Sequence, residues 1–391
     1  TRPQTRATKP HRRVHRQFGR TLMQQQIIDK PIISADSHIT EPPQIYDAVS
    51  SKYRDTAPKM VTAENGGSVF IIDGMPDPFP ITLASGAGLR GPQLAERAKA
   101  KFEDCYVGGW DSKQRLQDQD DDGIGGEVIY PSLGMFLCNH PDLAYRTEMF
   151  RAYNEWLSDY CSIDRKRLIG LGQTAMASPE QGIRDLEEIK KLGLKGVMMP
   201  GFPDIEDYDH EMYDPFWEAA VELDMPLSFH ILTYKDGLGK ARGPKVNAFM
   251  SIIRGNQDII GTMIFSGVFQ RHPKLKVVCA EADAGWVPHY MYRMDHAIKT
   301  NPFTAGQVTL EKDPSDYFRE NIYLTFQDDI IALKLKDFFN KERMMWASDF
   351  PHLDSTYPHS IKMLTEQTSE MTQQEKTWLL HDNVSALYSL N

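Results

Sequence analysis

Eight short apolar segments, each followed by a turn or a polar stretch, constrain the fold of this 391-residue chain most strongly. Most are continuous runs rather than alternating patterns, which indicates strands buried on both faces, as in parallel sheets covered by helices. Helical patterns lie between them, so we predict an α/β fold, a (β/α)8 TIM-type barrel. The predicted strands are Ile32–His38, Gly126–Ser132, Leu168–Ala175, Gly196–Gly201, Pro226–Ile231, Lys276–Asp283, Ile322–Gln327 and Met344–His352.

Two of the predicted helices carry clear signals for where they begin. The helix over Pro179–Leu192 follows Ser178, an expected N-cap, and ends at Gly193. The helix over Pro215–Leu223 follows Asp214, which we expect to cap it in the same way.

A long insertion, about residues 60–125, separates the first two predicted strands. It contains the apolar runs Val69–Ile72 and Pro80–Leu83, which are separated by Asp73-Gly74-Met75-Pro76. An Asp-Gly pair between apolar runs is a hairpin signal, so we predict a β-hairpin over the mouth of the barrel.

The first 28 residues form a basic tail that contains no acidic residue. We expect residues 29–391 to form the barrel, and the tail to be a targeting peptide or an upstream extension, with Met23 as a plausible start. If the tail is ordered, it has to lie against an acidic surface, because so polar a segment cannot bury a core of its own.

The charge balance of the whole chain restricts its partners. The formal net charge is -10, which argues against binding to nucleic acid or to an anionic membrane. No apolar run approaches the roughly 18 residues of a membrane-spanning helix. The four cysteines form no Cys-x-x-Cys pair, and we expect reduced thiols in a cytoplasmic protein.

Ligand-type side chains occur at four of the predicted strand ends. Residues two apart on a strand point to the same side, so Asp36 and His38 present a carboxylate beside an imidazole. Strand ends converge on one mouth of a barrel, and so many charged groups meeting there need a neutralising partner such as a divalent cation. The other such residues are His230, Glu281, Asp283, Asp349 and His352.

Five segments together resemble the amidohydrolase superfamily, and within it the group typified by aminocarboxymuconate semialdehyde decarboxylase. The resemblance covers about residues 30–390. It is carried by Asp36-Ser37-His38 with Glu41-Pro42, by Phe229-His230, by Arg271-His272-Pro273-Lys274-Leu275-Lys276, by Gly285-Trp286-Val287-Pro288 with Arg293 and Asp295, and by Ser348-Asp349-Phe350-Pro351-His352.

The resemblance implies that Asp36, His38, His230 and Asp349 are metal ligands, with Asp349 also transferring protons. The chain departs from the family pattern in two places: the first-strand motif, often His-x-His, is Asp36-x-His38, and the sixth-strand position, often a histidine, is Glu281. Glu281 is therefore a candidate ligand, as a bridge between two metals or a general base beside one.

The ligand set bears on which metal is bound. The strand Gly196–Gly201 contains no lysine, because Lys195 precedes it, so a dinuclear site bridged by a carboxylated lysine is not expected. Glu41 is a candidate for a further carboxylate ligand of the metal. Ligation rich in carboxylates favours manganese or iron over zinc, with one ion or two.

Three further residues are candidates for substrate binding. Arg293 is suited to grip a carboxylate with two parallel hydrogen bonds, His352 to hold a carboxylate, and Trp286 to form a pocket wall. Arg293 is equally well explained by a salt bridge on the helix surface, and Trp286 by simple packing.

Three functions remain open. The first is a metal-dependent lyase or hydrolase acting on a small carboxylated substrate, for which the resemblance favours non-oxidative decarboxylation. The second is a dinuclear iron or iron–manganese oxygenase that hydroxylates a small substrate, suggested by Glu281 and Glu41. The third is a non-catalytic subunit paired with an active paralogue. The chain is expected to be a homo-oligomer, or a hetero-oligomer with such a paralogue.

Overall fold

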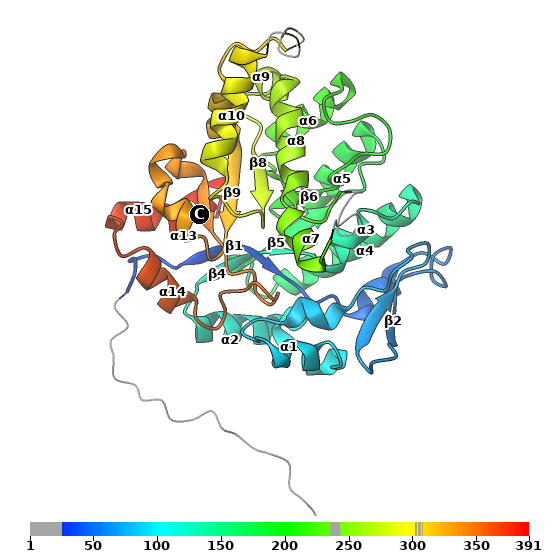
Figure 1. The fold of residues 1–391 in the computed structure, drawn as a ribbon. Coiled ribbons are helices and arrows are strands. Elements are labelled where there is room, and N and C mark those ends of the chain that lie inside the picture. Colours follow the sequence, from blue (N-terminus) through cyan, green and yellow to red (C-terminus); the bar gives the residue numbers. More distant parts are fainter. Residues whose placement is uncertain (1–25, 235–242, 302, 304–305, 307, 391) are drawn as a thin grey trace, which may run out of the picture.

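Eight parallel strands form the centre of the structure, a computed structural model that describes residues 26–234, 243–301, 303, 306 and 308–390. The basic tail lies almost entirely outside the described residues. The strands follow one another in chain order, as in the predicted barrel, which the structure confirms (Figure 1). They are β1 (Ile33–His38), β4 (Gly126–Tyr130), β5 (Leu168–Gln173), β6 (Gly196–Met199), β7 (Leu227–His230), β8 (Val277–Ala280), β9 (Ile322–Phe326) and β10 (Met344–Trp346).

Backbone hydrogen bonds connect the first strand to the chain that follows the last one. The Asp349 N–H donates to Asp36 O at 2.9 Å, and the His38 N–H donates to Phe350 O at 2.7 Å. These bonds bring the end of β1 against the residues after β10, so ligand candidates more than 300 positions apart in the sequence become neighbours.

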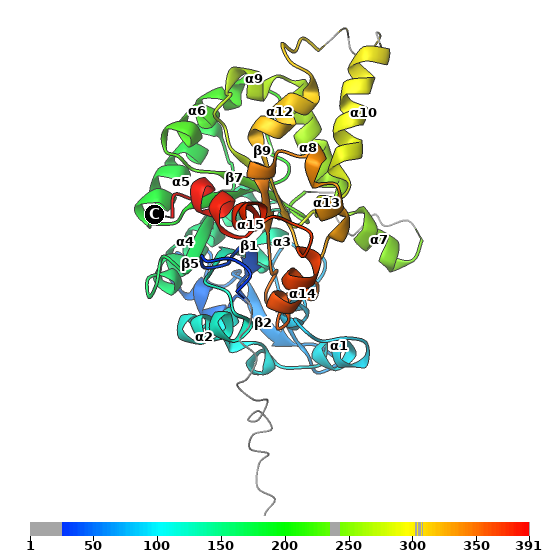
Figure 2. The same ribbon diagram turned by 90° about the vertical axis from the view of Figure 1, so that its left-hand side faces the viewer.

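Helices surround the strands, and α7 projects away from the barrel (Figure 2). The α5 helix starts as predicted, because the Ser178 hydroxyl accepts the Gln181 N–H, and Gly193 follows it with a φ of 78°. The main helices are α3 (Leu133–Leu137), α4 (Leu143–Cys161), α5 (Pro179–Lys191), α6 (Asp214–Glu222), α7 (Lys245–Ser251), α8 (Arg254–Phe265), α9 (Val268–Arg271), α10 (Val287–Thr300), α12 (Pro314–Asn321), α13 (Ile330–Lys334), α14 (Ser360–Gln367), α15 (Gln373–Thr377) and α16 (Asn383–Leu387).

The predicted cap at Asp214 is wrong. Asp214 is the first residue of α6 and makes no capping bond. Its carboxylate instead accepts hydrogen bonds from Arg271 and from His272 Nε2, at 3.0 Å each. Asp214 therefore ties α6 to the turn that leads into β8.

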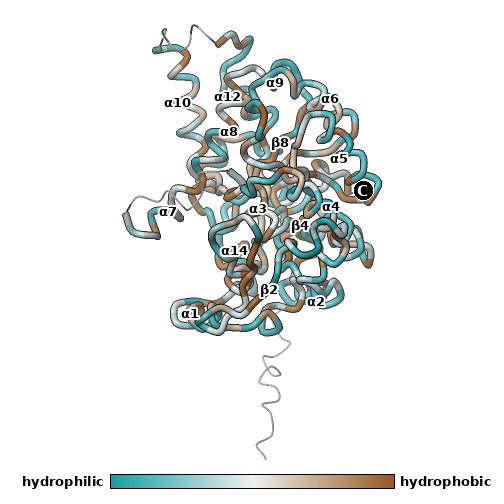
Figure 3. Tube along the Cα trace, turned by 90° about the vertical axis from the view of Figure 1, so that its right-hand side faces the viewer, coloured by the Kyte–Doolittle hydropathy of each residue, from teal (hydrophilic) through white to brown (hydrophobic). Residues whose placement is uncertain are grey.

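The core lies between the strands and their surrounding helices. Residues of β5, β6, β7 and β8 are buried throughout, as expected for strands covered on both faces. The strands are largely hydrophobic and the outer helices mixed (Figure 3). Trp217 of α6 and Trp346 of β10 are among the largest fully buried side chains.

The insertion between β1 and β4 contains a hairpin, but the strand predicted at Val69–Ile72 pairs with the segment before it rather than with Pro80–Leu83. Strand β2 (Lys59–Thr62) pairs in antiparallel fashion with β3 (Ser68–Ile71), while Ile81–Ser85 forms a short 3-10 helix. The predicted turn at Asp73 does reverse the chain, since Phe70 and Phe79 form an isolated antiparallel bridge. Two helices follow, α1 (Pro92–Arg97) and α2 (Ser112–Asp122).

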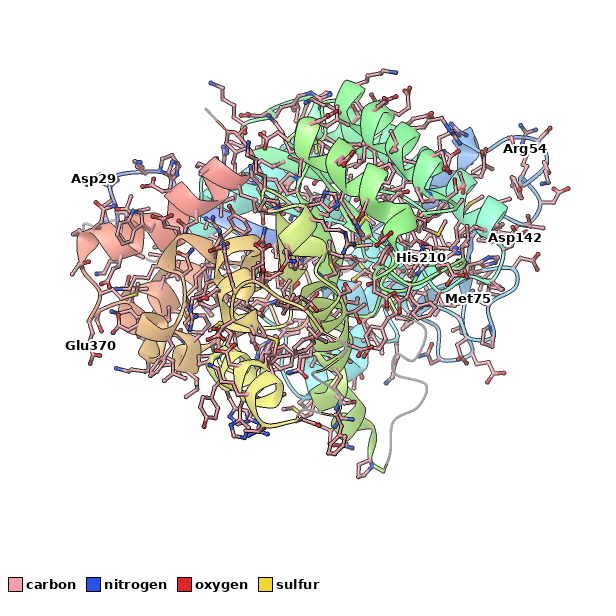
Figure 4. The ribbon with its side chains drawn as sticks, turned by 90° about the horizontal axis from the view of Figure 1, so that it is seen from above. Asp29, Arg54, Met75, Asp142, His210 and Glu370 are labelled. Atoms are coloured by element: carbon pink, nitrogen blue, oxygen red, sulfur yellow. The ribbon has the colours of Figure 1, made fainter. Side chains whose placement is uncertain are left out.

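The insertion packs on the start of α4. His140 Nε2 donates to Asp73 O at 2.6 Å, and the His140 ring stacks on Tyr145. Met75 lies two residues after Asp73, and Asp142 lies two residues after His140. Figure 4 shows Met75 and Asp142 close together, on the opposite side of the molecule from Asp29 and Glu370. Among the described helices, none is both long and apolar enough to cross a membrane.

Candidate metal centre

The five predicted metal ligands converge at the carboxyl ends of β1, β7, β8 and β10. His38 Nε2 lies 3.4 Å from a carboxylate oxygen of Asp36, of Glu281 and of Asp349. His230 Nε2 lies 3.0 Å from Glu281 Oε2 and 3.7 Å from Asp36 Oδ2. Parallel pairing explains part of this arrangement, because His230 lies opposite Ala280, the residue before Glu281.

Both histidines direct Nε2 at this cluster. His38 Nδ1 donates to Pro131 O at 2.9 Å and His230 Nδ1 donates to Ile231 O at 3.1 Å, because a carbonyl oxygen can only accept. In the neutral ring, which is the form that binds a metal, the proton therefore sits on Nδ1 and Nε2 carries the lone pair.

Six buried polar atoms of the cluster lack a hydrogen-bond partner among the described residues. Unsatisfied buried polar groups are costly, and here they face one another across a few ångströms. A divalent cation satisfies oxygen and nitrogen lone pairs at once, so the residues fit a metal ion. The atoms are Asp36 Oδ1, His38 Nε2, His230 Nε2, Glu281 Oε2, Asp349 Oδ1 and Asp349 Oδ2.

The electrostatics of the cluster also call for positive charge. Burial, together with repulsion from Glu281 and Asp36, raises the pKa of Asp349 well above its ordinary value. Burial alone would lower the pKa of His230, but the Asp36 and Glu281 carboxylates raise it to about 10. Burial opposes ionisation of Glu281, yet the two histidines outweigh it and lower its pKa.

Strained backbone accompanies the ligands. Glu281, Asp283 and Asp349 have φ values of 54°, 52° and 55°, in the left-handed region that residues with a Cβ seldom adopt. Such strain persists where the surroundings over-determine it, and it clusters at functional sites. Here it turns the chain sharply at the ends of β8 and β10.

His352 is part of the same cluster. Its ring stacks on His38 with centroids 3.7 Å apart, and its Nδ1 lies 3.3 Å from Asp349 Oδ1. The Ser132 hydroxyl donates to Ile39 O at 2.6 Å, so its oxygen accepts from His352 Nε2 at 2.7 Å. The His352 lone pair therefore points at Asp349. Burial, with the neighbouring His38, lowers the pKa of His352 well below its ordinary value.

Glu41, the further carboxylate considered from the sequence, does not join the ligand groups found among the described residues. Its Oε1 accepts the backbone N–H groups of Ser132 and Gly134 at 2.8 and 3.3 Å, which holds the loop after β4. Burial raises the pKa of Glu41 to about 7. Lys195 lies on the surface, near Ser389 O, and so does not approach the centre.

Two supporting residues were missed by the sequence analysis. The Thr325 hydroxyl of β9 donates to Asp36 Oδ2 at 3.2 Å and accepts the Glu281 N–H at 2.9 Å. Arg115 of α2 donates to His38 O at 2.7 Å and to Phe350 O at 3.3 Å, and it pairs with Glu127. Neither residue carries a motif, since a strand threonine and a helix arginine are common in any sequence.

A cavity of about 370 Å3 opens beside the cluster, at the ends of β8 and β9. Trp286 lines it, and Glu281 is the one of the five predicted metal ligands among the described lining residues. Arg293 does not line it, because its side chain is exposed on the outside of α10. Burial, together with Asp329, raises the pKa of Asp283 in this cavity to about 7.

Comparison with known proteins identifies relatives of this chain. A family model described as Amidohydrolase matches residues 142–390. The chain is 27% identical to a 2-amino-3-carboxymuconate-6-semialdehyde decarboxylase from Dictyostelium discoideum, over 67% of this chain and 74% of that protein.

Solved structures agree with the fold. An amidohydrolase from Mycobacterium avium subsp. paratuberculosis K-10 is 19% identical and aligns with a TM-score of 0.74, over 93% of this chain and 100% of that one. A 5-carboxyvanillate decarboxylase from Novosphingobium aromaticivorans DSM 12444, complexed with manganese and 4-hydroxy-3-methoxy-5-nitrobenzoic acid, is 19% identical and aligns with a TM-score of 0.69, over 94% and 100%.

Proposed function

The chain belongs to the amidohydrolase family, and from this premise we propose that it is a metal-dependent decarboxylase of a small carboxylated substrate. The observation that carries the proposal is the convergence of unpartnered oxygen and nitrogen atoms on His38 Nε2. The curated decarboxylase relative supports decarboxylation over hydrolysis.

One divalent ion would be held by Asp36, His38, His230, Glu281 and Asp349. When bound, it would supply a Lewis acid that polarises a substrate oxygen. The ligand groups found among the described residues both contain His38, and its single free nitrogen can bind one ion. This sharing favours one ion over the two that an iron or iron–manganese oxygenase would need. The manganese in a related structure makes manganese a reasonable candidate.

Asp349 is proposed to move the proton. Replacing a carboxylate on carbon by hydrogen requires a proton at that carbon, and the donor must lie beside the bound substrate. Asp349 is fully buried, its Oδ2 has no hydrogen-bond partner, and His352 Nδ1 lies 3.3 Å from its Oδ1. His352 is held by Ser132 and is placed to orient Asp349. Glu281, whose side chain is 14% exposed, faces the cavity where a substrate would enter.

Metal analysis tests this proposal. Protein purified without added metal should contain about one divalent ion per chain, and His38→Ala should contain much less. Chelation should abolish CO2 release, and manganese should restore it. 2,6-Dihydroxybenzoate, which has one carboxylate, and 5-carboxyvanillate, which has two, are suitable first substrates, since related proteins are named for them.

Two results would reject the proposal. A protein that binds no divalent ion, as isolated or after reconstitution, has no metal centre. Two tightly bound redox metals per chain would support the oxygenase instead.

A further inference from the structure

The cavity beside the metal cluster has an unusual charge. The described residues that line it include Glu281, Asp283, Asp328, Asp329 and Asp354, and none of the described lining residues is a lysine, arginine or histidine. A site that accepted a substrate with a second carboxylate would be expected to offer a basic partner for it.

Two of these acidic groups are already occupied by the protein. Asp329 accepts the N–H groups of Ala284 and Gly285, at 2.9 and 2.6 Å, and that of Ala332 at 2.9 Å. Asp328 accepts a hydrogen bond from Gln367. Among the described residues, Asp283 accepts only a long bond of 3.4 Å from the Gln327 N–H, and Asp354 lies at the exposed rim. Asp283 and Asp354 are therefore the groups best placed to meet a ligand.

A buried amide in the cavity wall indicates independently that a polar ligand completes it. Gln327 is 3% exposed and lines the cavity, yet its Nε2 has no hydrogen-bond partner among the described residues. A buried donor without an acceptor is costly, and a substrate oxygen would satisfy it. Ile231, Ile253 and Trp286 supply an apolar wall on which a flat or aliphatic body can pack.

We infer that this cavity selects a substrate with one carboxylate, an apolar body and a protonated amine that faces Asp283 and Asp354. The inference deepens the proposed function and rests on it, because the single carboxylate is the group presented to the metal centre. A second metal ion is a weaker explanation of the acidic wall, since neither Asp283 nor Asp354 belongs to a ligand group among the described residues.

Electrostatics explain the selection. Three carboxylates around one divalent ion leave a net negative charge, and Asp283 and Asp354 add to it. A second carboxylate on the substrate would enter this field unpaired, whereas an ammonium would form charge-assisted hydrogen bonds with the wall. One such bond corresponds to roughly a tenfold or greater difference in affinity.

Three benzoates that differ only in their meta substituent test the inference: 3-(aminomethyl)benzoate, 3-methylbenzoate and isophthalate. Their binding to the manganese-loaded protein is measured by calorimetry, which needs no turnover. We expect 3-(aminomethyl)benzoate to bind about tenfold or more tightly than either other probe. Asp283→Asn and Asp354→Asn should reduce this preference, and the double variant should remove it. Asparagine tolerates the left-handed φ of residue 283, so Asp283→Asn should preserve the local backbone.

A charge-matched variant separates a local effect from a change in net charge. Glu188→Gln removes one negative charge from the exposed face of α5, where Glu188 pairs with Lys191, and it should leave the preference unchanged.

The outcomes distinguish the two proposals. Tighter binding of isophthalate by the wild type, or a preference that survives in the double variant, overturns this inference and leaves the decarboxylase proposal standing. Failure of all three carboxylates to bind the manganese-loaded protein counts against the carboxylate-binding metal centre, and the inference falls with it.

Discussion

The two sides of the ligand cluster are built differently. On the side of β1 and β10, Asp36, His38 and Asp349 are fully buried, and backbone hydrogen bonds cross between the strand ends. On the side of β8 and β9, Glu281 lines an open cavity. The contrast suggests a division of labour, in which the closed side fixes the ligand geometry and holds the proton donor, and the open side admits the substrate.

Arg115 shows how the closed side is supported. It comes from α2, in the insertion, and donates to the carbonyl oxygens of His38 and Phe350. We predicted from the sequence that the insertion holds a hairpin over the mouth. Its α2 supports the ends of β1 and β10, so part of the insertion belongs to the framework of the centre.

The largest expected effect is on turnover, at Asp349. Asp349→Asn keeps the shape and one oxygen of the side chain but cannot carry the same proton. We expect kcat to fall by about 10²- to 10⁴-fold while some metal binding persists. Single-turnover CO2 release and metal content, measured on the same preparation, test this. An Asn variant with normal turnover would remove Asp349 from the proton-transfer step.

Removal of Arg115 should have the largest effect on stability. Arg115→Met leaves Glu127 as a buried charge without its partner and frees two carbonyl oxygens, so we expect a loss of about 3–5 kcal/mol in the free energy of unfolding. Denaturant titration measures it. Arg151→Met, which breaks pairs with Glu148 and Glu155 on the surface of α4, is the matched control and should cost about 0–1 kcal/mol. Equal losses in the two variants would show that Arg115 does not support the closed side.

How far the sequence predicts each side depends on what kind of contact builds it. The ligand candidates could be found because parallel strands place their carboxyl ends at one mouth, so that Asp36-Ser37-His38 and Ser348-Asp349-Phe350-Pro351-His352 are informative without any coordinates. The supporting contacts of Arg115 and Thr325 depend on tertiary packing between segments far apart in the chain. No local pattern encodes them.

The errors made from the sequence have the same origin. Asp214 precedes Pro215 and so has the local signature of an N-cap, but Arg271 and His272 approach it from another part of the chain. In the insertion, the Asp73-Gly74 turn was predicted to join two strands. The more polar segment Lys59–Thr62 pairs with Ser68–Ile71 instead.

A smaller effect is expected at Thr325, which links the closed side to the open one. Thr325→Val keeps the shape but removes the hydroxyl that joins Asp36 Oδ2 to the Glu281 N–H. We expect metal affinity to fall by about tenfold, the lower end of the effect of removing such supporting bonds. Thr325→Ser retains the hydroxyl and should restore most of the affinity, as measured by competition with a chelator. If the valine and serine variants bind metal alike, the two sides are not coupled through this hydroxyl.

The smallest expected effect lies outside both sides and tests whether the contrast is local. Ser178→Ala removes the cap of α5, whose side chain accepts the Gln181 N–H, and should lower the free energy of unfolding by about 1 kcal/mol. The cap bond joins Ser178 to Gln181, and neither belongs to a ligand group among the described residues, so metal affinity should remain at the wild-type value. A chelator titration that shows weaker metal binding in Ser178→Ala would mean that any loss of stability loosens the centre. The effects at Arg115 and Thr325 could then no longer be assigned to their particular hydrogen bonds.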